Sequence, residues 1–321
     1  MKKISILIPC FNEVENAEGI SNAIIQVFEE QLSAYDYEIV FIDNASTDGT
    51  RELIEVLCRE NSKIKAIFNI TNFGQFNSPF YGMIQCDGDA VIPVVADFQD
   101  PPELIPKLVE QWEKGHKVVC AVKKKSKENP IIFALRTIYY RMIKRMSSVS
   151  FIEHFTGFAL YDKSFIKLMR ELDDPLPFMR GIVAEYGEGF GLTTIEFEQP
   201  KRKAGKTHNN FFTLYDAAML SFTSYTKVGL RIATFFGFFV SLVSFIIGIW
   251  YLVYKLRHWG AFNVGTAPLT VGIFFMGGIF LLFLGLIGEY ILNINSRVIK
   301  RPVVVEERRV GWEIEEDLDN Q

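Results

Sequence analysis

Acidic and amide side chains stand together in the segment ADFQDPP, residues 96–102. Asp97, Gln99 and Asp100 follow a short apolar run, a position where a carboxylate could hold a divalent cation against the phosphates of a ligand. Oxygen ligands favour hard ions, here Mg²⁺ or Mn²⁺. The same side chains could instead cap a helix predicted to begin at Pro101, because carboxylates accept hydrogen bonds from the first N–H groups of a helix. The segment alone leaves both interpretations open.

A second acidic position is Asp43, which closes the run YEIVFID and is followed by Asn44. These two side chains could hydrogen-bond a base or a ribose, as the acidic residue of dinucleotide-binding folds does. They could equally form an Asx turn, since Asp and Asn often bond their own backbone two residues on.

Positive charge is concentrated around a flexible glycine in PKRKAGKTHNN, residues 200–210. Guanidinium and ammonium groups bind phosphate oxygens, so this segment suits a diphosphate or a lipid phosphate. A basic patch attracted to anionic lipid is the simpler alternative. The basic side chains are Lys201, Arg202, Lys203, Lys206 and His208.

Alternating apolar runs and helical patterns predict the elements that would position these groups. The predicted strands cover residues 4–9, 37–43, 64–68, 90–96 and 117–122, and the predicted helices cover 15–33, 49–61, 75–86 and 102–114. This alternation is typical of βαβ units on a parallel sheet. Ligands of such sheets bind at the carboxyl ends of the strands, where the polar segments described above begin.

Two uncharged apolar runs follow the predicted α/β part, from Ile232 to Tyr254 and from Thr266 to Gly288. Each reaches the ~20 residues that a helix needs to cross a hydrocarbon core of ~30 Å. A buried helical hairpin in a large globular domain is the alternative. We therefore predict two transmembrane helices within residues 231–293.

The topology of these helices follows from their number and from the charges beside them. Two spans place both chain ends on one side, and the N-terminal segment becomes polar too soon for a signal peptide, so that side is expected to be the cytoplasm. Lys255, Arg257 and His258 between the spans run against this orientation. The basic residues that agree with it are Lys227, Arg231, Arg297, Lys300, Arg301, Arg308 and Arg309.

Composition excludes several classes of protein. A net charge of −4 gives no sign of a nucleic acid partner. The four cysteines are scattered, which argues against a zinc site or a disulfide framework. Residues 131–149 and 211–229 are amphipathic and could lie in the headgroup layer or pack on the sheet.

The chain resembles the family 2 glycosyltransferases of GT-A fold, and within them the polyprenyl-phosphate glycosyltransferases such as bactoprenol glucosyltransferases and dolichol-phosphate mannose synthases. The resemblance runs nearly from end to end. DFQDPPELI and the GEY that ends the second span are its most specific pieces. The other matching pieces are PCFNE, FIDNASTDGT, NFGQ, GDAVIP, RMIKRM, RGI, RKAGKT and GLIGEY.

The resemblance implies roles for individual residues. Asp97 would bind Mg²⁺ or Mn²⁺ and act in catalysis together with Gln99. The nucleotide-sugar would be bound by Pro9, Asn12, Glu13, Asp43, Asn44, Gly74 and Gln75. The diphosphate or the acceptor phosphate would be bound by Arg141, Arg180, Arg202, Lys206 and His208.

The sequence departs from the family at two chemical positions. The metal motif is normally Asp-x-Asp, but Val95 replaces the first carboxylate. Gly157 and Ala159 stand where the family carries a proposed catalytic Asp and an Arg. A phosphomonoester with a second pKa of ~6 is already largely ionised at pH 7, so such an acceptor needs positioning more than a base. Asp100, Glu153 or His154 are candidates to replace the missing groups.

Together these features predict a GT-A domain with a mostly parallel sheet over residues 1–210, an amphipathic juxtamembrane helix over 211–230, two spans within 231–293 and a cytosolic tail over 294–321. The expected activity is transfer of one sugar, glucose or a related hexose, from a UDP-sugar to a polyprenyl phosphate at the cytoplasmic face of a cell membrane, with inversion and a divalent metal. Self-association into a homo-oligomer is left open. A catalytically silent membrane scaffold is the alternative, and a processive polysaccharide synthase is disfavoured because two spans are too few for a polymer channel.

Overall fold

The computed structural model describes residues 1–125, 147, 149–200, 202–203, 211–226, 228–257, 266–299 and 301–312. The chain divides into two compact units. The first comprises Met1–Arg141, Val149–Asn210 and Ile299–Gln321, and the second comprises Met142–Ser148 and Phe211–Val298. The last residues of the chain thus belong to the first unit, although the second unit precedes them in sequence.

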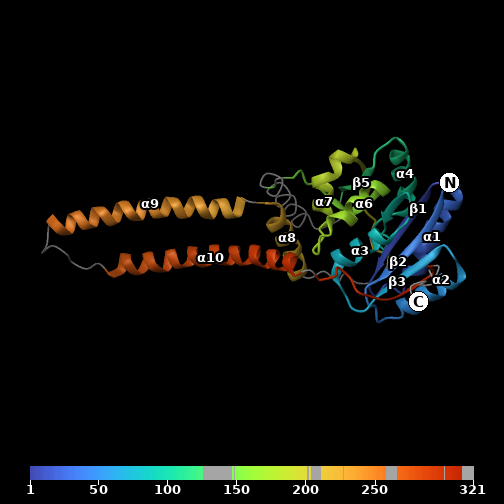
Figure 1. Cartoon of the computed structure of the whole chain (residues 1–321), viewed down its shortest axis with the longest axis horizontal. Helices are drawn as coiled ribbons and strands as arrows, with labels where there is room; N and C mark the ends of the chain where they lie inside the picture. The colour runs from blue at the N-terminus through green and yellow to red at the C-terminus, as the bar shows by residue number, and fades with distance from the viewer. Residues whose placement is uncertain are drawn as a thin grey trace, which may run out of the picture. The chain divides into compact units, whose positions relative to one another are not determined.

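An eight-stranded sheet is the centre of the first unit (Figure 1), in the order β7-β5-β6-β4-β1-β2-β3-β8. Strands β1, β2, β3 and β4 run parallel to their neighbours among these four, and β5 is parallel to β7. Strand β6 is antiparallel to β4 and β5, and β8 is antiparallel to β3. The sheet is mostly parallel, as predicted. The strands are β1 Lys3–Cys10, β2 Asp36–Asp43, β3 Ile64–Asn69, β4 Ala90–Pro93, β5 Val118–Lys125, β6 Phe155–Asp162, β7 Thr193–Glu198 and β8 Glu306–Val310.

Helices cover both faces of the sheet. Helices α1, α2 and α4 contribute to one hydrophobic cluster, and α3, α6 and α7 contribute to the other. A short 3₁₀ turn, Pro102–Leu104, leads into α4, and another, Gly187–Phe190, follows α7. The helices are α1 Ala17–Gln31, α2 Thr50–Glu60, α3 Gly74–Gln85, α4 Ile105–Glu113, α6 Lys163–Leu172 and α7 Met179–Tyr186.

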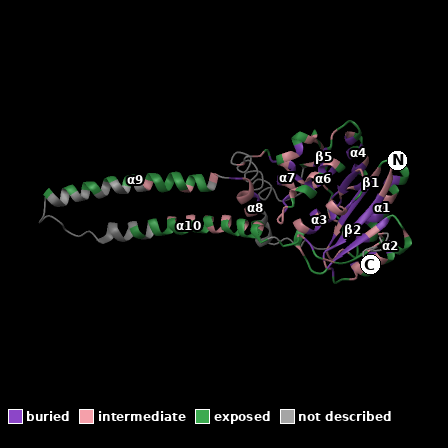
Figure 2. Cartoon of the chain, in the orientation of Figure 1, coloured by how far each residue is buried: buried purple, intermediate pink, exposed green. Residues whose placement is uncertain are grey.

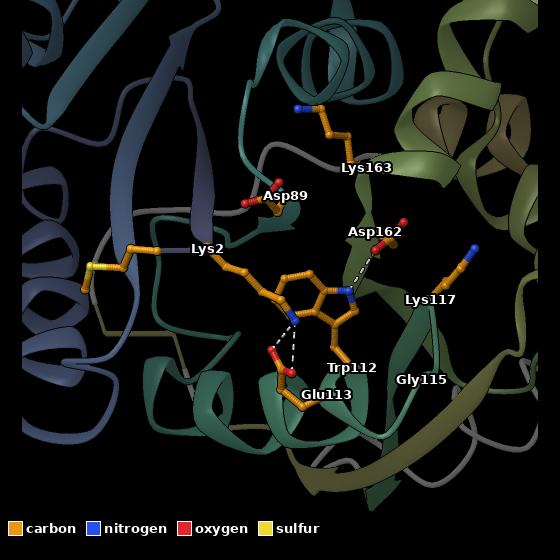
Figure 3. Close-up of a pocket in the computed structure, with 9 residues that line it drawn as sticks. Lys2, Asp89, Trp112, Glu113, Gly115, Lys117, Asp162 and Lys163 are labelled. Atoms are coloured by element: carbon orange, nitrogen blue, oxygen red, sulfur yellow. Dashed lines mark hydrogen bonds and ion pairs between the residues drawn. The ribbon is translucent and has the colours of Figure 1, made fainter.

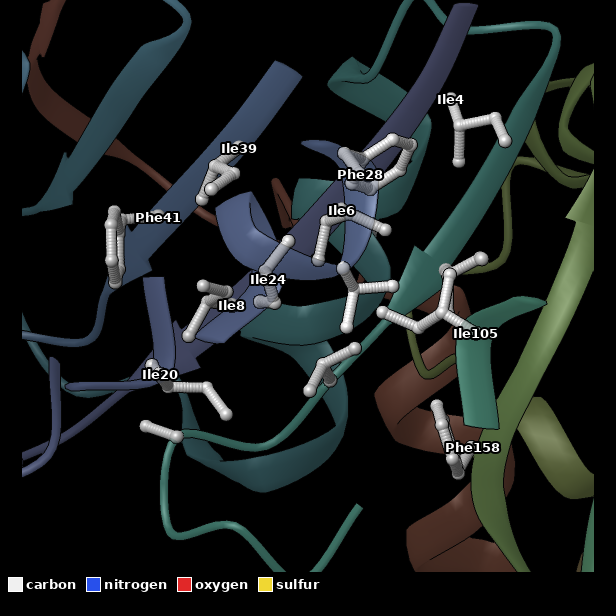
Figure 4. Packing of buried hydrophobic residues seen from close by; sticks show 14 of the residues in the cluster. Ile4, Ile6, Ile8, Ile20, Ile24, Phe28, Ile39, Phe41, Ile105 and Phe158 are labelled. Carbon is white, nitrogen blue, oxygen red and sulfur yellow. The ribbon is translucent and has the colours of Figure 1, made fainter. Parts of the chain in front are cut away.

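Side-chain periodicity explains how the two clusters form. Successive residues of a strand point to opposite faces, so Ile4, Ile6 and Ile8 of β1 enter one cluster while Leu7 enters the other. Figure 4 shows the β1 isoleucines packed with side chains of α1 and β2. The buried residues of α1 recur at helical spacing, at Ile20, Ile24, Val27 and Phe28. Strands buried on both faces therefore appear in the sequence as continuous apolar runs. Figure 2 shows the buried strands.

The predicted strands and the first four predicted helices are confirmed, with shifted ends. The ends shift by up to three residues, as in β4, which ends at Pro93 rather than at residue 96. Its apolar run continues to Ala96, but the carboxylate of Asp100 accepts a hydrogen bond from the backbone N–H of Val95 at 3.3 Å. This bond closes residues 95–100 into a turn. Strands β6, β7 and β8 were not among the predicted strands.

The second unit contains α8 Phe211–Tyr225, α9 Val228–Arg257 and α10 Thr266–Val298. Polar bonds join α10 to the α8 segment, because Asn293 donates to the Thr223 hydroxyl at 2.7 Å and Tyr290 donates to the Thr226 carbonyl at 2.8 Å. Helix α10 extends to Val298, ten residues beyond the uncharged run that predicted it.

Within the described residues one helical stretch, Met276–Val298, is long and apolar enough to cross a membrane, and Leu230–Val240 forms a shorter apolar stretch. Most described side chains of α9 and α10 are exposed (Figure 2). One candidate span is thus present, and the second span predicted in α9 stays a prediction. The amphipathic helix predicted over residues 131–149 lies outside the described residues, apart from Ser147 and Val149.

Candidate active site

The crevice at the carboxyl edge of the sheet lies at β1, where the order in which the chain adds strands to the sheet reverses. Strand β1 pairs with β2 on one side and with β4 on the other, and such a reversal of strand order is where open α/β sheets bind ligands. The segments that leave these strands each contain a non-glycine residue in the left-handed region, namely Asn12 at φ 56°, Ala45 at φ 62° and Phe98 at φ 63°. Backbone strain of this kind is concentrated at functional sites.

Asp43, at the end of β2, is fully buried. Its Oδ2 accepts a hydrogen bond from the backbone N–H of Ser46 at 3.1 Å and lies 3.5 Å from the guanidinium Nε of Arg51. Its Oδ1 is buried and has no hydrogen-bond partner among the described residues. Burial raises the pKa of the Asp43 carboxyl, and Ser46 and Arg51 oppose that rise. A buried acceptor without a partner is costly, so Oδ1 would gain from a ligand N–H or O–H.

Two asparagines fix the loops beside Asp43. The side-chain oxygen of Asn12 accepts from the backbone N–H of Thr47 at 2.8 Å. The Asn44 side chain accepts from the backbone N–H of Phe73 at 2.9 Å and donates to the side-chain oxygen of Asn72 at 2.9 Å. These contacts hold the loop before α2 and the loop before α3 at the same edge of the sheet.

Arg202 joins two carboxylates that are far apart in sequence. Its Nε donates to Asp97 Oδ2 at 2.8 Å, and its Nη2 donates to Glu13 Oε1 at 3.0 Å. The Asp97 Oδ1 accepts from the backbone N–H of Gln99 at 3.0 Å. The remaining nitrogen of Arg202, Nη1, is buried and has no partner among the described residues. A planar guanidinium with an unused donor suits an oxygen-rich anion such as a diphosphate.

A cavity of about 260 Å³ opens beside this crevice. Its walls are mostly apolar and include three aromatic side chains, Phe76, Phe158 and Phe178, with Asp100 and Arg180 as charged members. The remaining lining residues are Pro9, Gln75, Pro79, Met83, Pro93, Val94, Val95, Thr156, Gly157 and Met179.

Two members of the cavity wall bear on its chemistry. Burial, reinforced by the nearby Asp97 charge, raises the pKa of Asp100 to about 7. Gly157 has φ 115°, and a side chain added there would meet no described heavy atom within 4 Å. The absence of a side chain at Gly157 therefore leaves open space.

Comparison with known proteins identifies the family. The model described as "Glycosyl transferase family 2" matches residues 5–170. The SfII prophage-derived bactoprenol glucosyl transferase of Shigella flexneri is 32% identical over 94% of this chain and 96% of its own length. The prophage bactoprenol glucosyl transferase homolog of Escherichia coli K12 is 33% identical over 95% of this chain and 99% of its own length.

This chain belongs to glycosyl transferase family 2. It is therefore an enzyme of sugar transfer, and its α/β fold with a mostly parallel sheet is GT-A-like, as predicted. Among solved structures, glucosyl-3-phosphoglycerate synthase from Mycobacterium tuberculosis, in complex with Mn²⁺, UDP-glucose and phosphoglyceric acid, has 17% identity and a TM-score of 0.47 over 69% of this chain and 78% of that chain.

The described residues of this glycosyltransferase offer a metal ion few protein ligands. Among the described residues no group of three or more His, Cys, Asp or Glu side chains could hold an ion. Asp97 is one carboxylate at the expected place, and the guanidinium of Arg202 already neutralises its Oδ2. An ion held by Asp97 would thus take most of its ligands from donor phosphates and water, as Mg²⁺ commonly does.

The structure brings most of the sequence-predicted residues to one edge. Pro9, Gln75 and Arg180 line the cavity, and Gly74 begins α3 with φ 85°. The side-chain carbonyl of Gln99 lies 3.4 Å from the Gln199 amide, which donates to it. The predicted phosphate-binding residues Arg141, Lys206 and His208 lie outside the described residues. Their roles, like the other assigned roles, remain predictions.

Arg51 lies at the candidate site and is not among the residues predicted from the sequence. It follows the FIDNASTDGT segment at the start of α2, and its guanidinium approaches Asp43. The sequence could have indicated Arg51 only through its position directly after FIDNASTDGT, because nothing in the sequence shows the direction of its side chain.

A second hollow, of about 590 Å³, lies at the opposite, amino edge of the sheet (Figure 3). Lys2 donates to the Glu113 carboxylate at 2.8 Å, and the Trp112 indole donates to Asp162 at 2.8 Å. The larger hollow therefore lies away from the predicted site residues, and several of its polar groups are paired with one another.

Proposed function

We propose that this glycosyltransferase transfers a single hexose from a UDP-sugar to a polyprenyl phosphate at the cytoplasmic face of a cell membrane, with inversion at the anomeric carbon. The observation that carries the proposal concerns two buried atoms at the carboxyl edge, Asp43 Oδ1 and Arg202 Nη1, for which the described part of the chain supplies no hydrogen-bond partner. One is an acceptor suited to a nucleoside and the other is a donor suited to a diphosphate. The names of the two bactoprenol-related relatives support the acceptor class.

The donor would lie across the edge from Asp43 to Arg202. Asp43 Oδ1 would accept a hydrogen bond from the uridine, and Asn12 and Asn44 would hold the loops around it. Pro9, Glu13, Gly74 and Gln75 would complete the nucleotide-sugar site. Arg202 would bind the diphosphate through Nη1 while its other nitrogens keep Glu13 and Asp97 in place.

Asp97 would hold Mg²⁺ or Mn²⁺ with the diphosphate oxygens. A bound ion stabilises the negative charge that develops on the leaving UDP, the kind of electrostatic term that dominates many enzymatic rate enhancements. Arg202 supplies a second positive charge at the same carboxylate, and Gln99 is held beside it by its backbone bond to Asp97.

The acceptor phosphate would attack from the cavity side. One of its oxygens forms a bond to the anomeric carbon as the bond from that carbon to the UDP oxygen breaks, which inverts the configuration. A phosphomonoester with a second pKa of ~6 is largely dianionic at pH 7, so no side chain has to remove a proton. This supports activity despite Gly157 at the family's base position. Arg180, which lines the cavity, would attract the phosphate.

The second unit would bring the enzyme to its lipid substrate. We propose that α9 and α10 both span the bilayer and that α8 lies at its surface, with residues 1–210 and the tail in the cytoplasm. The candidate span Met276–Val298 supports α10. For α9 the support is the uncharged run of 23 residues from Ile232 to Tyr254, which meets the length requirement of ~20.

The deciding experiment uses the purified full chain in detergent with undecaprenyl phosphate and Mg²⁺ or Mn²⁺. Radiolabelled UDP-glucose, UDP-galactose and UDP-N-acetylglucosamine are supplied separately, and lipid-linked product is extracted and sized. We expect a single labelled sugar on the lipid from one donor, and loss of product with EDTA. Failure with all three donors, while a competent relative works beside it, would refute the proposal, and a polymeric product would indicate a processive synthase.

A catalytically silent membrane scaffold is the second candidate, favoured by Val95 and Gly157 at positions where the family carries carboxylates. Calorimetry separates the two. Binding of UDP that strengthens with Mn²⁺ supports the transferase, whereas no UDP binding by the folded chain supports the scaffold.

A further inference from the structure

The C-terminal strand β8 returns to the sheet after the second unit. Seven residues separate it from the end of α10, and it pairs antiparallel with β3, with Phe68 opposite Arg308 and Ala66 opposite Val310. Figure 1 shows this strand, in red, beside β3. Strand β3 follows β2 in the sheet, and β2 ends at Asp43, so β8 lies two strands from the nucleotide-binding carboxylate.

Arg51 connects β8 to Asp43. Its Nη2 donates to the Glu307 carboxylate of β8 at 2.7 Å, while its Nε lies 3.5 Å from Asp43 Oδ2. The guanidinium carbon lies 5.2 Å from the centre of the Phe68 ring. The guanidinium of Arg308, also on β8, lies 4.6 Å from the same ring centre and pairs with Glu55 of α2.

This arrangement restrains the orientation of Arg51. Guanidinium groups hydrogen-bond in fixed directions and stack on aromatic faces, so Glu307 and Phe68 together define where the Nε points. The Arg51–Glu307 ion pair is largely solvent-exposed on the Glu307 side, and such pairs contribute little to stability. Its consequence is therefore positional, because it keeps a positive charge against a fully buried carboxylate.

We propose that β8 is part of the donor site, with Glu307 as a positioning residue that acts through Arg51 on Asp43. The positive charge of Arg51, 3.5 Å from Oδ2, favours the ionised form of the Asp43 carboxylate, and Oδ1 would then accept a hydrogen bond from the nucleoside. The inference rests on the proposed function, since it assigns Asp43 to the uridine end of the donor. The strand that follows the membrane helices thus completes the nucleotide site of the first unit.

The simpler role for β8 is to cover the edge of β3, since an unpaired edge strand invites aggregation. That role predicts equal effects from any lost contact between β8 and α2. The chain offers a matched pair, because Glu307 binds Arg51 from β8 and Glu55 binds Arg308 from α2. Of these two ion pairs, the first includes the arginine that approaches Asp43.

The experiment measures UDP affinity by calorimetry on the full chain in detergent with Mn²⁺. We expect Glu307→Ala to weaken UDP binding about 5-fold, because Arg51 loses the hydrogen bond that orients it. We expect Arg51→Ala to weaken it about 10- to 30-fold, because the positive charge beside Asp43 is lost as well. Arg51→Lys should restore part of the loss, because it keeps the charge. Glu55→Ala should stay within about 2-fold of the native chain, because its partner is exposed.

The pH profile of UDP binding is a second measurement, and it should not change if the only role of β8 is to cover the edge of β3. Among the described residues, Arg51 from α2 and the Cys10 thiol from β1 lie near Asp43. Burial and the Asp43 charge raise the pKa of the Cys10 thiol so far that it stays neutral. Without a fixed Arg51, the Asp43 carboxyl should protonate at higher pH. Glu307→Ala should therefore lose UDP affinity at a higher pH than Glu55→Ala, and the comparison cancels the titration of UDP itself.

The outcomes separate this inference from the proposed function. If the native chain does not bind UDP, the proposed function fails. If the native chain binds UDP and Glu307→Ala matches Glu55→Ala in affinity and pH profile, β8 only covers an edge and the inference fails. Should Glu307→Ala melt below the assay temperature, Glu307→Gln makes the same comparison, with a smaller expected loss and the same criterion.

Discussion

The amino and carboxyl edges of the central sheet use the same residue types in opposite ways. At the amino edge, Glu38 is buried and accepts from the Ser5 hydroxyl at 2.6 Å, and it pairs with Lys3 at 2.6 Å and Lys65 at 2.9 Å. At the carboxyl edge, Asp43 is equally buried, yet one of its oxygens has no partner among the described residues.

The difference teaches where to look for binding in this fold. The amino edge combines a carboxylate, two ammonium groups and a hydroxyl into a network in which the charges satisfy one another. The carboxyl edge adds left-handed backbone at Asn12, Ala45 and Phe98, and some of its buried donors and acceptors find no partner in the described ranges of the chain. Buried charges that are paired with one another stabilise the folded state, whereas unpaired buried groups at a crevice indicate a binding site for a ligand.

The sharpest test of this contrast compares two arginines that each make two hydrogen bonds. Arg202→Ala removes a donor from the carboxyl edge and leaves Glu13 and Asp97 facing each other without the cation between them. We expect kcat/KM for sugar transfer to fall about 100- to 1000-fold, the usual loss when a preorganised charge-stabilising donor is removed. Radiometric transfer to polyprenyl phosphate measures it.

The matched control is Arg170→Ala. Arg170 donates to the carbonyls of Ile84 at 2.7 Å and Cys86 at 2.8 Å, which belong to the chain before β4 and not to the crevice. Its loss should lower the melting temperature while kcat/KM per folded molecule stays within about 3-fold, since no transition-state contact is lost. Equal activity losses in the two variants would remove the distinction between the edges.

The amino edge should respond in stability. Glu38→Gln leaves Lys3 and Lys65 without their shared carboxylate, and we expect a loss of ~3 kcal/mol, the value that the lowered pKa of Glu38 implies. For a first unit of this size that corresponds to a fall of roughly 6–12 °C in melting temperature. Differential scanning fluorimetry measures it, and UDP affinity at a temperature where the variant is folded should be unchanged.

The pH dependence of the same group gives an independent check. Hydrogen bonds from Lys3, Ser5 and Lys65 outweigh burial and lower the pKa of Glu38 from 4.5 to about 2. A carboxylate whose folded pKa is depressed stabilises the protein above its ordinary pKa, and that contribution is lost as pH falls from about 4.5 toward 2. Native melting temperature should drop across this window more steeply than that of Glu38→Gln. Parallel curves would mean that Glu38 is not held ionised by its partners.

Gly157 tests whether the open space at the carboxyl edge is used. At φ 115° a side chain is strained, so Gly157→Ala should cost about 1–2 kcal/mol. Its methyl group would also enter the space beside the cavity, so the KM for polyprenyl phosphate should rise while UDP affinity stays constant. Titration of both substrates separates the effects, and a rise confined to UDP would place the acceptor elsewhere.

Sequence alone predicted the half of the fold that local periodicity encodes. The runs that form β1 to β5, and the helices between them, have apolar patterns that can be recognised without knowledge of their partners in the fold. The strand EERRV at Glu306–Val310 has no such pattern, because an edge strand can expose charged side chains and still pair through its backbone. Its place beside β3 depends on a contact across more than 230 residues.

The sequence predicted which residues lie at the candidate site better than it predicted the contacts among their side chains. Asp43 and Asp97 follow apolar runs, so their edge of the sheet could be inferred from strand direction. That Arg202 binds both Glu13 and Asp97, which are 189 and 105 residues away, follows only from the folded chain. The same is true of Arg51, whose side chain could have turned to solvent.

The smallest expected effect is at the hollow of the amino edge. Lys2 pairs with Glu113 at 2.8 Å, and the two side chains are 51% and 39% exposed. Exposed ion pairs contribute ~0–1 kcal/mol because water screens the charges and the side chains lose entropy on pairing. Lys2→Ala should therefore shift the melting temperature by roughly 4 °C or less and leave transfer unchanged. A large loss of transfer would mean that this hollow contributes to the reaction, and would contradict the assignment of a structural role to the amino edge and a binding role to the carboxyl edge.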